Sequence, residues 1–160
     1  MADVGVHCID TLRYILRDEV VRVQASTRPS ENGEVDASAA MILEFSRGTL
    51  ATVDVSARAQ YRTALELVGE TEVLNSDYAL TVDSPLRVDI LREARVSETR
   101  EFTNCDAYAR MLDSFSEWIE RGTVFSAPGE EGWRNQIVID AGYESAGSGT
   151  AISITNSDVW

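Results

Sequence analysis

Residues 3–17, DVGVHCIDTLRYILR, decide the fold of this 160-residue chain. The apolar side chains recur at the spacing of one helix face: Val6, Ile9, Leu12 and Leu16. Asp3 is a suitable N-cap, because its carboxylate can accept a hydrogen bond from a backbone N–H of the first turn. Arg13 and Arg17 lie near the other end, where positive charge interacts favourably with the helix dipole. The pattern predicts a helix from about Val4 to Arg17.

Alternating apolar and polar side chains follow this helix and predict a series of β-strands. The predicted strands cover residues 20–26, 38–46, 49–59, 63–68, 71–74, 79–82, 86–92, 96–102 and 151–155. Residues 27–36 contain proline, asparagine and glycine and are predicted to form a loop, whereas Arg47-Gly48 is predicted to form a tight hairpin turn. Half-buried strands of this kind leave one face of a sheet free for solvent or a partner.

Two more helices are predicted, one at residues 106–121 that ends at Gly122 and one that follows Pro128 and ends near Gly149. Two tryptophans on their apolar faces are expected in the core: Trp118 and Trp133. A helix, then many strands, then two helices is typical of the α+β class. We expect a single domain of residues 1–160 that is truncated at its N-terminus, because functional-looking polar residues begin immediately.

The bulk composition excludes several kinds of partner. The formal net charge is -13, and every basic residue is arginine. Nucleic acid and membrane surfaces are therefore not expected partners, because both attract basic proteins. Cys8 and Cys105 form no CxxC motif, so we expect free thiols in a cytoplasmic protein. No GxGxxG opens a helix after a strand, so the sequence carries no dinucleotide-binding fingerprint.

The residues best suited to chemistry lie in the first predicted helix. Asp3, His7, Asp10 and Tyr14 follow one another at the spacing of a single helix face. A carboxylate beside a histidine orients the ring and favours its charged form, and such a pair can take a proton from a substrate hydroxyl. The alternatives are that Asp3 only caps the helix, that Asp10 is a solvated surface residue, that His7 is an interior histidine, or that the three side chains bind a metal ion.

The same segment carries a resemblance to a known family. Residues 3–10 are similar to the D-x-G-x-H-x-x-D helix that opens the C-terminal domain of the glucose–fructose oxidoreductase, inositol dehydrogenase and MocA family. The PGEEG stretch at 128–132 and the residues at 137–146, IVIDAGYESA, resemble the last helix of that domain. The resemblance spans essentially the whole chain, and the strands between the two motifs match in pattern more than in residues.

The resemblance implies a fold and an activity. The implied fold is an open-faced, mostly antiparallel β-sheet with helices on one face. The implied reaction is hydride transfer between a sugar or polyol carbon and NAD or NADP, in which an aspartate and a histidine act with a lysine from a preceding Rossmann domain. By match to the motif, Asp3 and His7 take the catalytic positions and Asp10 takes a position that binds a substrate hydroxyl. This chain departs from the family by having no Rossmann domain and no lysine.

We therefore interpret the chain as the substrate-side domain of an NAD(P)-dependent dehydrogenase that is inactive without its Rossmann domain. The expected partners are a sugar or polyol, that Rossmann domain, and a second copy in a homodimer or higher homo-oligomer. We expect the dimer to use the exposed sheet face, lined by small apolar residues such as Ala51, Val53 and Val55. The alternatives are a non-catalytic binding or dimerisation module of the same fold, and a metal-dependent hydrolase built on Asp3 and His7.

The absence of a glycine-rich strand–turn–helix generates a first prediction. The isolated chain is expected not to bind NADH or NADPH measurably, because no such turn supplies the backbone amides that hold the pyrophosphate. Isothermal titration calorimetry of the purified chain with each cofactor measures this directly. Micromolar affinity for either cofactor contradicts the prediction.

Overall fold

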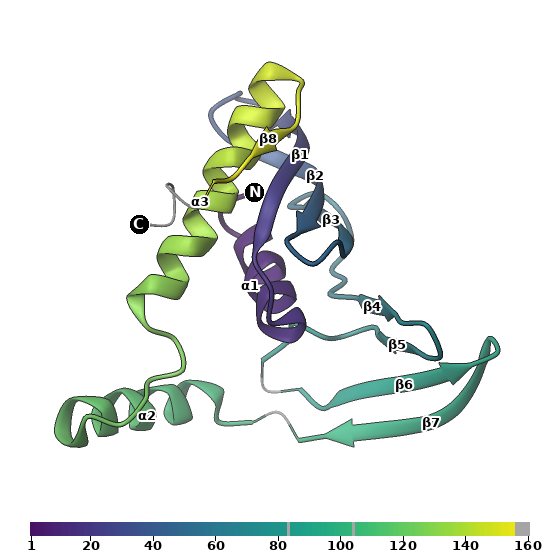
Figure 1. The fold of residues 1–160 in the computed structure, drawn as a ribbon, viewed down its shortest axis with the longest axis vertical. Helices are drawn as coiled ribbons and strands as arrows, with labels where there is room; N and C mark the ends of the chain where they lie inside the picture. Colours follow the sequence, from purple (N-terminus) through teal and green to yellow (C-terminus); the bar gives the residue numbers. More distant parts are fainter. Residues whose placement is uncertain (83, 104, 156–160) are drawn as a thin grey trace. The chain divides into compact units, whose positions relative to one another are not determined.

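The computed structural model describes residues 1–82, 84–103 and 105–155. Within these residues three α-helices and eight β-strands divide into two compact units (Figure 1). The first unit combines residues 1–59 with the chain from residue 127 onward, and the second unit consists of residues 60–126. The α+β class and the open antiparallel sheets are confirmed, and each unit contains one four-stranded sheet.

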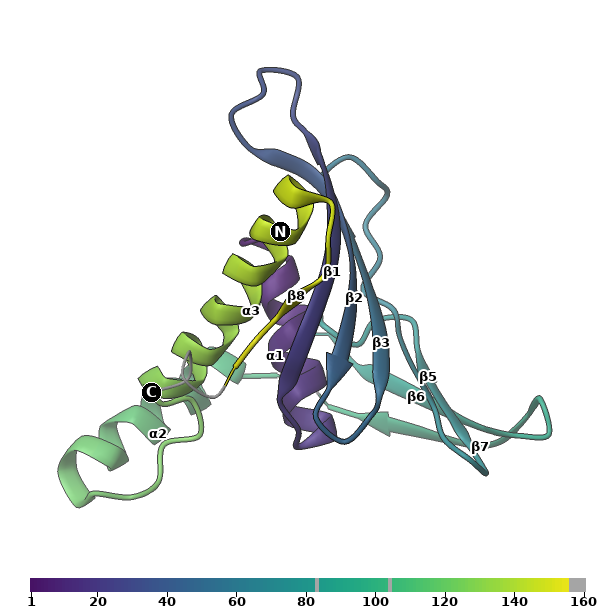
Figure 2. The ribbon, with the colours of Figure 1, turned by 45° about the horizontal axis from the view of Figure 1, so that its top comes forward.

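The first unit is a sheet with two helices. Its elements are α1 (Gly5–Leu16), β1 (Val20–Pro29), β2 (Asp36–Phe45), β3 (Leu50–Ser56), α3 (Gly129–Ser148) and β8 (Ile152–Ser153). The strand order is β3-β2-β1-β8. Figure 2 shows α1 and α3 on the same side of this sheet. The predicted helices on one face are therefore present in this unit.

Strand register places the apolar side chains of the first unit on the face that the helices cover. Val23 pairs with Leu43, and Met41 pairs with Val53, so all four side chains share that face and all are buried. The helices contribute buried apolar side chains to the same core: Ile9, Leu12, Val138, Ile139 and Ala141. Each large aliphatic side chain buried here contributes about 1.5–3 kcal/mol of hydrophobic stabilisation.

The glycine of the opening motif has a packing role in this core. A Cβ added at Gly5 would lie 3.3 Å from the Met41 side chain, which is tighter than ordinary contact. Gly5 therefore allows α1 to approach the sheet closely, and a larger residue here would force Met41 to move. His7 and Asp10 of the motif lie on the same helix, α1, and Gly5 allows this helix to pack close to the sheet.

The uncovered face of the first sheet is more polar than we expected. Ala51, Val53 and Val55, which we predicted on the exposed face, instead pair with Leu43, Met41 and Ala39 and share the helix-covered face. The uncovered face carries exposed side chains from three strands: Gln24, Ser26, Ala40, Ile42, Thr52 and Asp54. The prediction was wrong because alternation identifies two faces but not which of them the helices cover. The homodimer itself stays a prediction.

The second unit contains four strands and one helix. Its elements are β4 (Leu65–Val68), β5 (Val73–Ser76), β6 (Leu86–Arg92), β7 (Arg95–Phe102) and α2 (Ala107–Arg121), and the strands pair in the order β4-β5-β6-β7. The strand predicted at residues 79–82 is wrong. The chain turns here, and the Thr81 hydroxyl donates a hydrogen bond to the Tyr78 carbonyl at 3.0 Å.

Most boundaries agree with the prediction to within a few residues. The first helix differs by one residue at each end, but Val4 and not Asp3 is its N-cap, and no side chain caps it. The loop predicted at 27–36 is shorter, because β1 continues to Pro29. Gly122 and Gly149 adopt positive φ angles, 66° and 72°, directly after α2 and α3, as expected for glycines that end helices.

The tryptophan prediction is wrong. Trp118 on α2 is 46% exposed and Trp133 on α3 is 54% exposed. No side chain of α2 is buried, and the rings of Phe115, Trp118 and Phe125 pack on one another with centroids 5.6–6.0 Å apart. A helical apolar stripe shows that a face can be covered, but it does not show that the rest of the same unit covers it.

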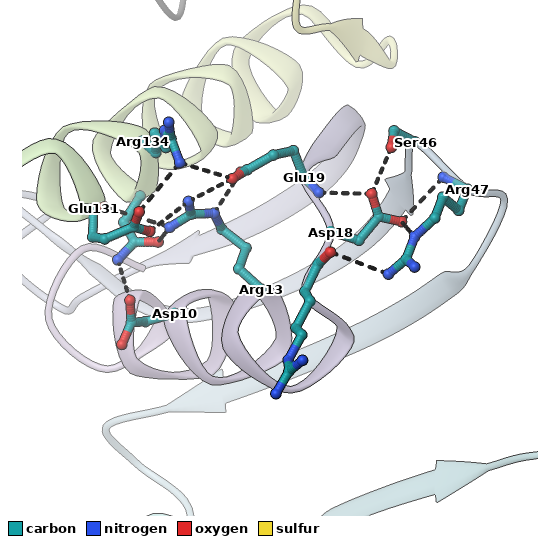
Figure 3. A network of polar contacts seen from close by, with 10 residues as sticks. Asp10, Arg13, Asp18, Glu19, Ser46, Arg47, Glu131 and Arg134 are labelled. Carbon is teal, nitrogen blue, oxygen red and sulfur yellow. Dashed lines mark hydrogen bonds and ion pairs between the residues drawn. The ribbon is translucent and has the colours of Figure 1, made fainter. Parts of the chain in front are cut away.

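A buried arginine joins three elements of the first unit. Arg13 is 4% exposed, and its guanidinium donates to side chains of Glu19, the residue before β1, and of α3 (Figure 3). Nε and Nη2 donate to the two carboxylate oxygens of Glu19 at 2.8 and 2.9 Å. Nη2 also donates to the Glu131 carboxylate at 2.8 Å. Nη1 donates to Asn135 Oδ1 at 2.7 Å and, more weakly, to the Glu131 carbonyl at 3.5 Å.

These contacts make the buried charge tolerable. A guanidinium has five N–H groups, and the five contacts give each one an acceptor. Burial opposes the charged form, but hydrogen bonds and attraction from Glu19 and then Glu131 outweigh it and raise the pKa of Arg13. Arg134 also contacts both carboxylates, at 3.3 and 3.2 Å. The Arg13 side chain therefore links α1 to the residue before β1 and to α3 through buried hydrogen bonds and ion pairs. It is not a solvated cation at the helix end.

Arg13→Met is expected to lower the free energy of unfolding by about 2 kcal/mol, because it leaves the buried Asn135 amide oxygen without its donor and removes the link to the partly exposed carboxylates of Glu19 and Glu131. Arg22→Met is the matched control, since Arg22 is an exposed arginine of β1 with a single ion pair to Glu44 at 3.6 Å. It is expected to cost less than about 1 kcal/mol. Urea unfolding of both variants, followed by circular dichroism, measures the difference, and equal effects refute the role of Arg13.

Asp18 forms a second polar joint, between the end of α1 and the β2–β3 hairpin. The Ser46 hydroxyl donates to Asp18 Oδ1, and the backbone N–H groups of Arg47 and Glu19 donate to the carboxylate at 3.0 and 2.9 Å. These hydrogen bonds, the one from Ser46 foremost, lower the Asp18 pKa from 3.8 to about 2 despite the opposing effect of burial. The carboxylate fixes the turn that we predicted at Arg47-Gly48.

Asp18→Asn is expected to destabilise the fold by about 2 kcal/mol at neutral pH, because the amide cannot accept the same set of hydrogen bonds. The pKa is lower in the folded chain, so the stabilisation is present above about pH 4 and is lost as the pH falls through about 2. The gap between wild type and variant should therefore shrink over this range. Urea unfolding at several pH values measures it, with exposed Asp54→Asn as control; a constant gap contradicts the assignment.

Candidate functional site

The candidate side chains lie on the solvent-facing side of the first helix. His7, Asp10 and Tyr14 are exposed residues of α1, and Asp3 is exposed in the turn that precedes it. The opposite side of the helix carries the buried Ile9. The structure therefore brings three of the four residues onto one helix face, and places the fourth just before it.

His7 is not an interior residue. Its side chain is exposed, and within the described residues it makes no hydrogen bond or ion pair. The interpretation of His7 as a packed structural histidine is therefore wrong. An exposed imidazole on a helix face can give or take a proton from a bound molecule without disturbing the core.

Asp10 is exposed but held. Its Oδ1 accepts a hydrogen bond of 2.7 Å from the side-chain amide of Asn135 on α3. Asn135 is 5% exposed, and its own carbonyl oxygen accepts from Arg13. Asp10 is therefore the outermost member of a chain of hydrogen bonds that begins at the buried guanidinium.

Two members of this arrangement were missed in the sequence. Arg13 was interpreted as a dipole-pairing cation, and Asn135 was not singled out. The available signal was a polar residue on an apolar helix face: Arg13 lies four positions after Ile9, and Asn135 lies four positions before Ile139. Polar residues on buried faces require partners, so each could have been identified as half of a polar contact.

Three further polar side chains have contacts within the fold: Tyr143, Arg58 and Arg62. The Tyr143 hydroxyl donates to Asp36 at 2.6 Å and so joins α3 to the start of β2. Arg58 and Arg62 form exposed ion pairs, with Glu31 at 3.5 Å and with Asp77 at 3.7 Å. None of these contacts indicates a ligand site.

In residues 1–82, 84–103 and 105–155, His, Cys, Asp and Glu side chains form no group of three that could hold a metal ion. Each helix start has an acidic residue nearby: Asp3, Asp106 and Glu130. Negative charge at these positions opposes the binding of a pyrophosphate. These residues therefore do not fit a nicotinamide dinucleotide.

The cysteines and the helices bear on two further predictions, that the thiols are free and that a membrane is not a partner. Both cysteines are free, Cys8 half-buried and Cys105 exposed. Burial raises the pKa of the Cys8 thiol, so this cysteine is not an activated nucleophile. None of the helices in residues 1–82, 84–103 and 105–155 is long and apolar enough to cross a membrane.

The exposed face suits a polyhydroxy compound. The Asp10 carboxylate can accept hydrogen bonds from hydroxyl groups, and the His7 ring can exchange a proton with one of them. Both groups project from one rigid helix that is fixed to the sheet through Gly5 and to α3 through Arg13. Sites on rigid elements hold reacting groups more accurately than sites on loops.

Sequence comparison identifies relatives of known activity. Residues 1–75 match the model of the GFO/IDH/MocA C-terminal domain. The chain is 28% identical over 155 residues to a D-xylose 1-dehydrogenase (NADP(+)) of Haloferax volcanii, covering 95% of this chain and 47% of the relative. It is 26% identical over 164 residues to an inositol 2-dehydrogenase of Pseudomonas savastanoi, covering 96% of this chain and 47% of that protein. The chain thus spans about half the length of these relatives.

Solved structures share the fold. An aldose-aldose oxidoreductase from Caulobacter crescentus, complexed with glycerol, superposes with a TM-score of 0.80 at 22% identity, over 95% of this chain and 46% of the other. An oxidoreductase from Agrobacterium radiobacter, in complex with NAD+, L-tartaric acid and magnesium, gives 0.72 at 18% identity, over 94% and 48%. These structures show the fold, and the match over residues 1–75 shows that this part of the chain is similar to the GFO/IDH/MocA C-terminal domain.

Proposed function

We propose that this chain is the substrate-side domain of an NAD(P)-dependent oxidoreductase that acts on a sugar, polyol or related hydroxy compound by hydride transfer. The observation that carries the proposal is the exposed face of α1, on which His7 stands free and Asp10 is held by Asn135. The face is built from the D-x-G-x-H-x-x-D residues that suggested the family.

The relatives support the substrate class. The two sequence relatives are named for D-xylose and for inositol, which both present several hydroxyl groups on adjacent carbons. A helix face with a carboxylate acceptor and a proton-exchanging imidazole is suited to such compounds. The chain covers 47% of each relative, which supports assigning the proposed activity to a protein that also contains a further domain.

In the proposed mechanism His7 is the acid–base residue. Oxidation of a hydroxyl-bearing carbon releases the hydroxyl proton, and a ring nitrogen within about 2.6–3.2 Å of that oxygen can accept it. Asp3, in the turn before α1, is proposed as the second catalytic residue, beside His7. Asp10 is proposed to bind a neighbouring hydroxyl and to orient the substrate.

The nicotinamide is assigned to the missing partner domain. The acidic residues near the helix starts of this chain do not fit the pyrophosphate. The proposal therefore includes a separate Rossmann domain, which also supplies the lysine that this chain lacks. NAD or NADP supplies the hydride-transfer chemistry in that combined site. Without it, this chain is expected to bind substrate weakly and to be inactive.

The catalytic assignment predicts a specific mutant pattern. In a protein that joins this chain to its nicotinamide-binding half, His7→Ala is expected to lower kcat by roughly 10²–10⁴, the range for loss of an acid–base group. Asp3→Asn is expected to lower it similarly. The melting temperature should barely change, because both side chains are exposed and bury little apolar area.

Glu144→Gln is the control, since Glu144 is an exposed carboxylate of α3 that has no role in the proposed site, and it should leave turnover and stability unchanged. Turnover and thermal unfolding are measured on the same preparations. Full activity in a well-folded His7→Ala protein refutes the catalytic assignment and favours the non-catalytic binding or dimerisation module.

A further inference from the structure

We propose that Asn135 is a positioning residue that holds the Asp10 carboxylate in one orientation, so that its second oxygen is presented to a substrate hydroxyl. The inference rests on the proposed function of Asp10 and extends the site from α1 to α3. In this inference, a buried amide on α3 determines how accurately the exposed face of α1 orients its ligand.

The orientation of the Asn135 amide is fixed by its two partners. A guanidinium can only donate hydrogen bonds, and an ionised carboxylate can only accept them. The amide oxygen must therefore face Arg13, and the amide nitrogen must face Asp10. Both contacts are 2.7 Å, so the assignment agrees with the geometry on each side. Asparagine is suited to this place because one short side chain provides an acceptor and a donor.

Asn135 is itself immobile. It is buried on α3, and Arg13, to which it is bonded, has its remaining N–H groups engaged by Glu19 and Glu131. Rotation of the amide would place two donors against each other and two acceptors against each other, which this network does not allow. The hydrogen bond to Asp10 therefore comes from a fixed point.

An exposed aspartate without such a bond samples several rotamers. Asp10 Oδ1 is occupied by Asn135, whereas Oδ2 makes no contact within the described residues. The bond from Asn135 thus selects one rotamer before any substrate arrives, and binding no longer has to order the side chain. His7 has no equivalent restraint in the described residues, which leaves Asp10 as the fixed reference on this helix face.

Asn135→Asp separates positioning from structure. It is nearly isosteric, it keeps an acceptor for Arg13, and it removes only the N–H that bonds Asp10 while placing like charge against it. NMR scalar couplings about χ1 of Asp10, measured on this chain, are expected to show one rotamer in the wild type and averaging in Asn135→Asp, with Glu144→Gln unchanged. A single rotamer in the variant, or averaging in the wild type, overturns the inference.

The functional arm uses the protein that joins this chain to its nicotinamide-binding half, with D-xylose and myo-inositol as probes. Asn135→Asp is expected to raise KM about tenfold, the effect of one lost hydrogen bond, with kcat within about twofold. Asp10→Ala should raise KM at least as much, and Asn135→Asp should add little in that background, because both act on one interaction.

The outcomes separate the two claims. If Asp10→Ala raises KM and Asn135→Asp does not, Asn135 is structural only and the inference is wrong while the proposed function stands. If Asp10→Ala leaves KM unchanged, the proposed role of Asp10 in binding fails, and the inference fails with it even if the couplings show that Asn135 fixes the rotamer. A purely structural role predicts lower stability in Asn135→Asp with unchanged KM, which unfolding measurements detect.

Discussion

The buried guanidinium of Arg13 is the interaction on which the first unit depends. A buried cation is costly unless every donor is matched, and its five N–H groups find acceptors on Glu19, Glu131 and Asn135. Those residues come from the chain entering β1 and from α3, so the charge is satisfied only when the two helices lie together on the sheet. Hydrophobic burial stabilises this packing, and the polar network makes its geometry unique.

The same network reaches the surface and divides the candidate site into a fixed part and a free part. Asp10 is connected to the core through Asn135, whereas His7 stands exposed on the same helix face. This division is chemically sensible, because a group that orients a ligand benefits from rigidity and a group that exchanges protons needs access. In the proposed function, this domain supplies the substrate-side part of a site that a second domain completes.

The second unit shows how far a periodic pattern can mislead. The apolar stripe of α2 was correctly predicted as helical, yet Trp118 and the rest of the stripe remain exposed. Alternation in the first sheet misled in the same way, since Val53 was assigned to the open face and lies under the helices. In both cases the pattern identified an apolar surface, and packing decided what covers it.

The sequence by itself determined the α+β class, the three helices, most of the strands, the family motif on α1 and the lack of a dinucleotide fingerprint. These follow from neighbours in the chain, because helix and strand periodicities and turn residues are local properties. Only the tertiary structure decided that Arg13 is buried, that Asp3 is not the cap, and that Asp10 pairs with Asn135, 125 residues away. A contact between distant residues depends on how the two helices pack on their common sheet. That packing is determined by the interactions of the whole unit and not by the sequence around either residue.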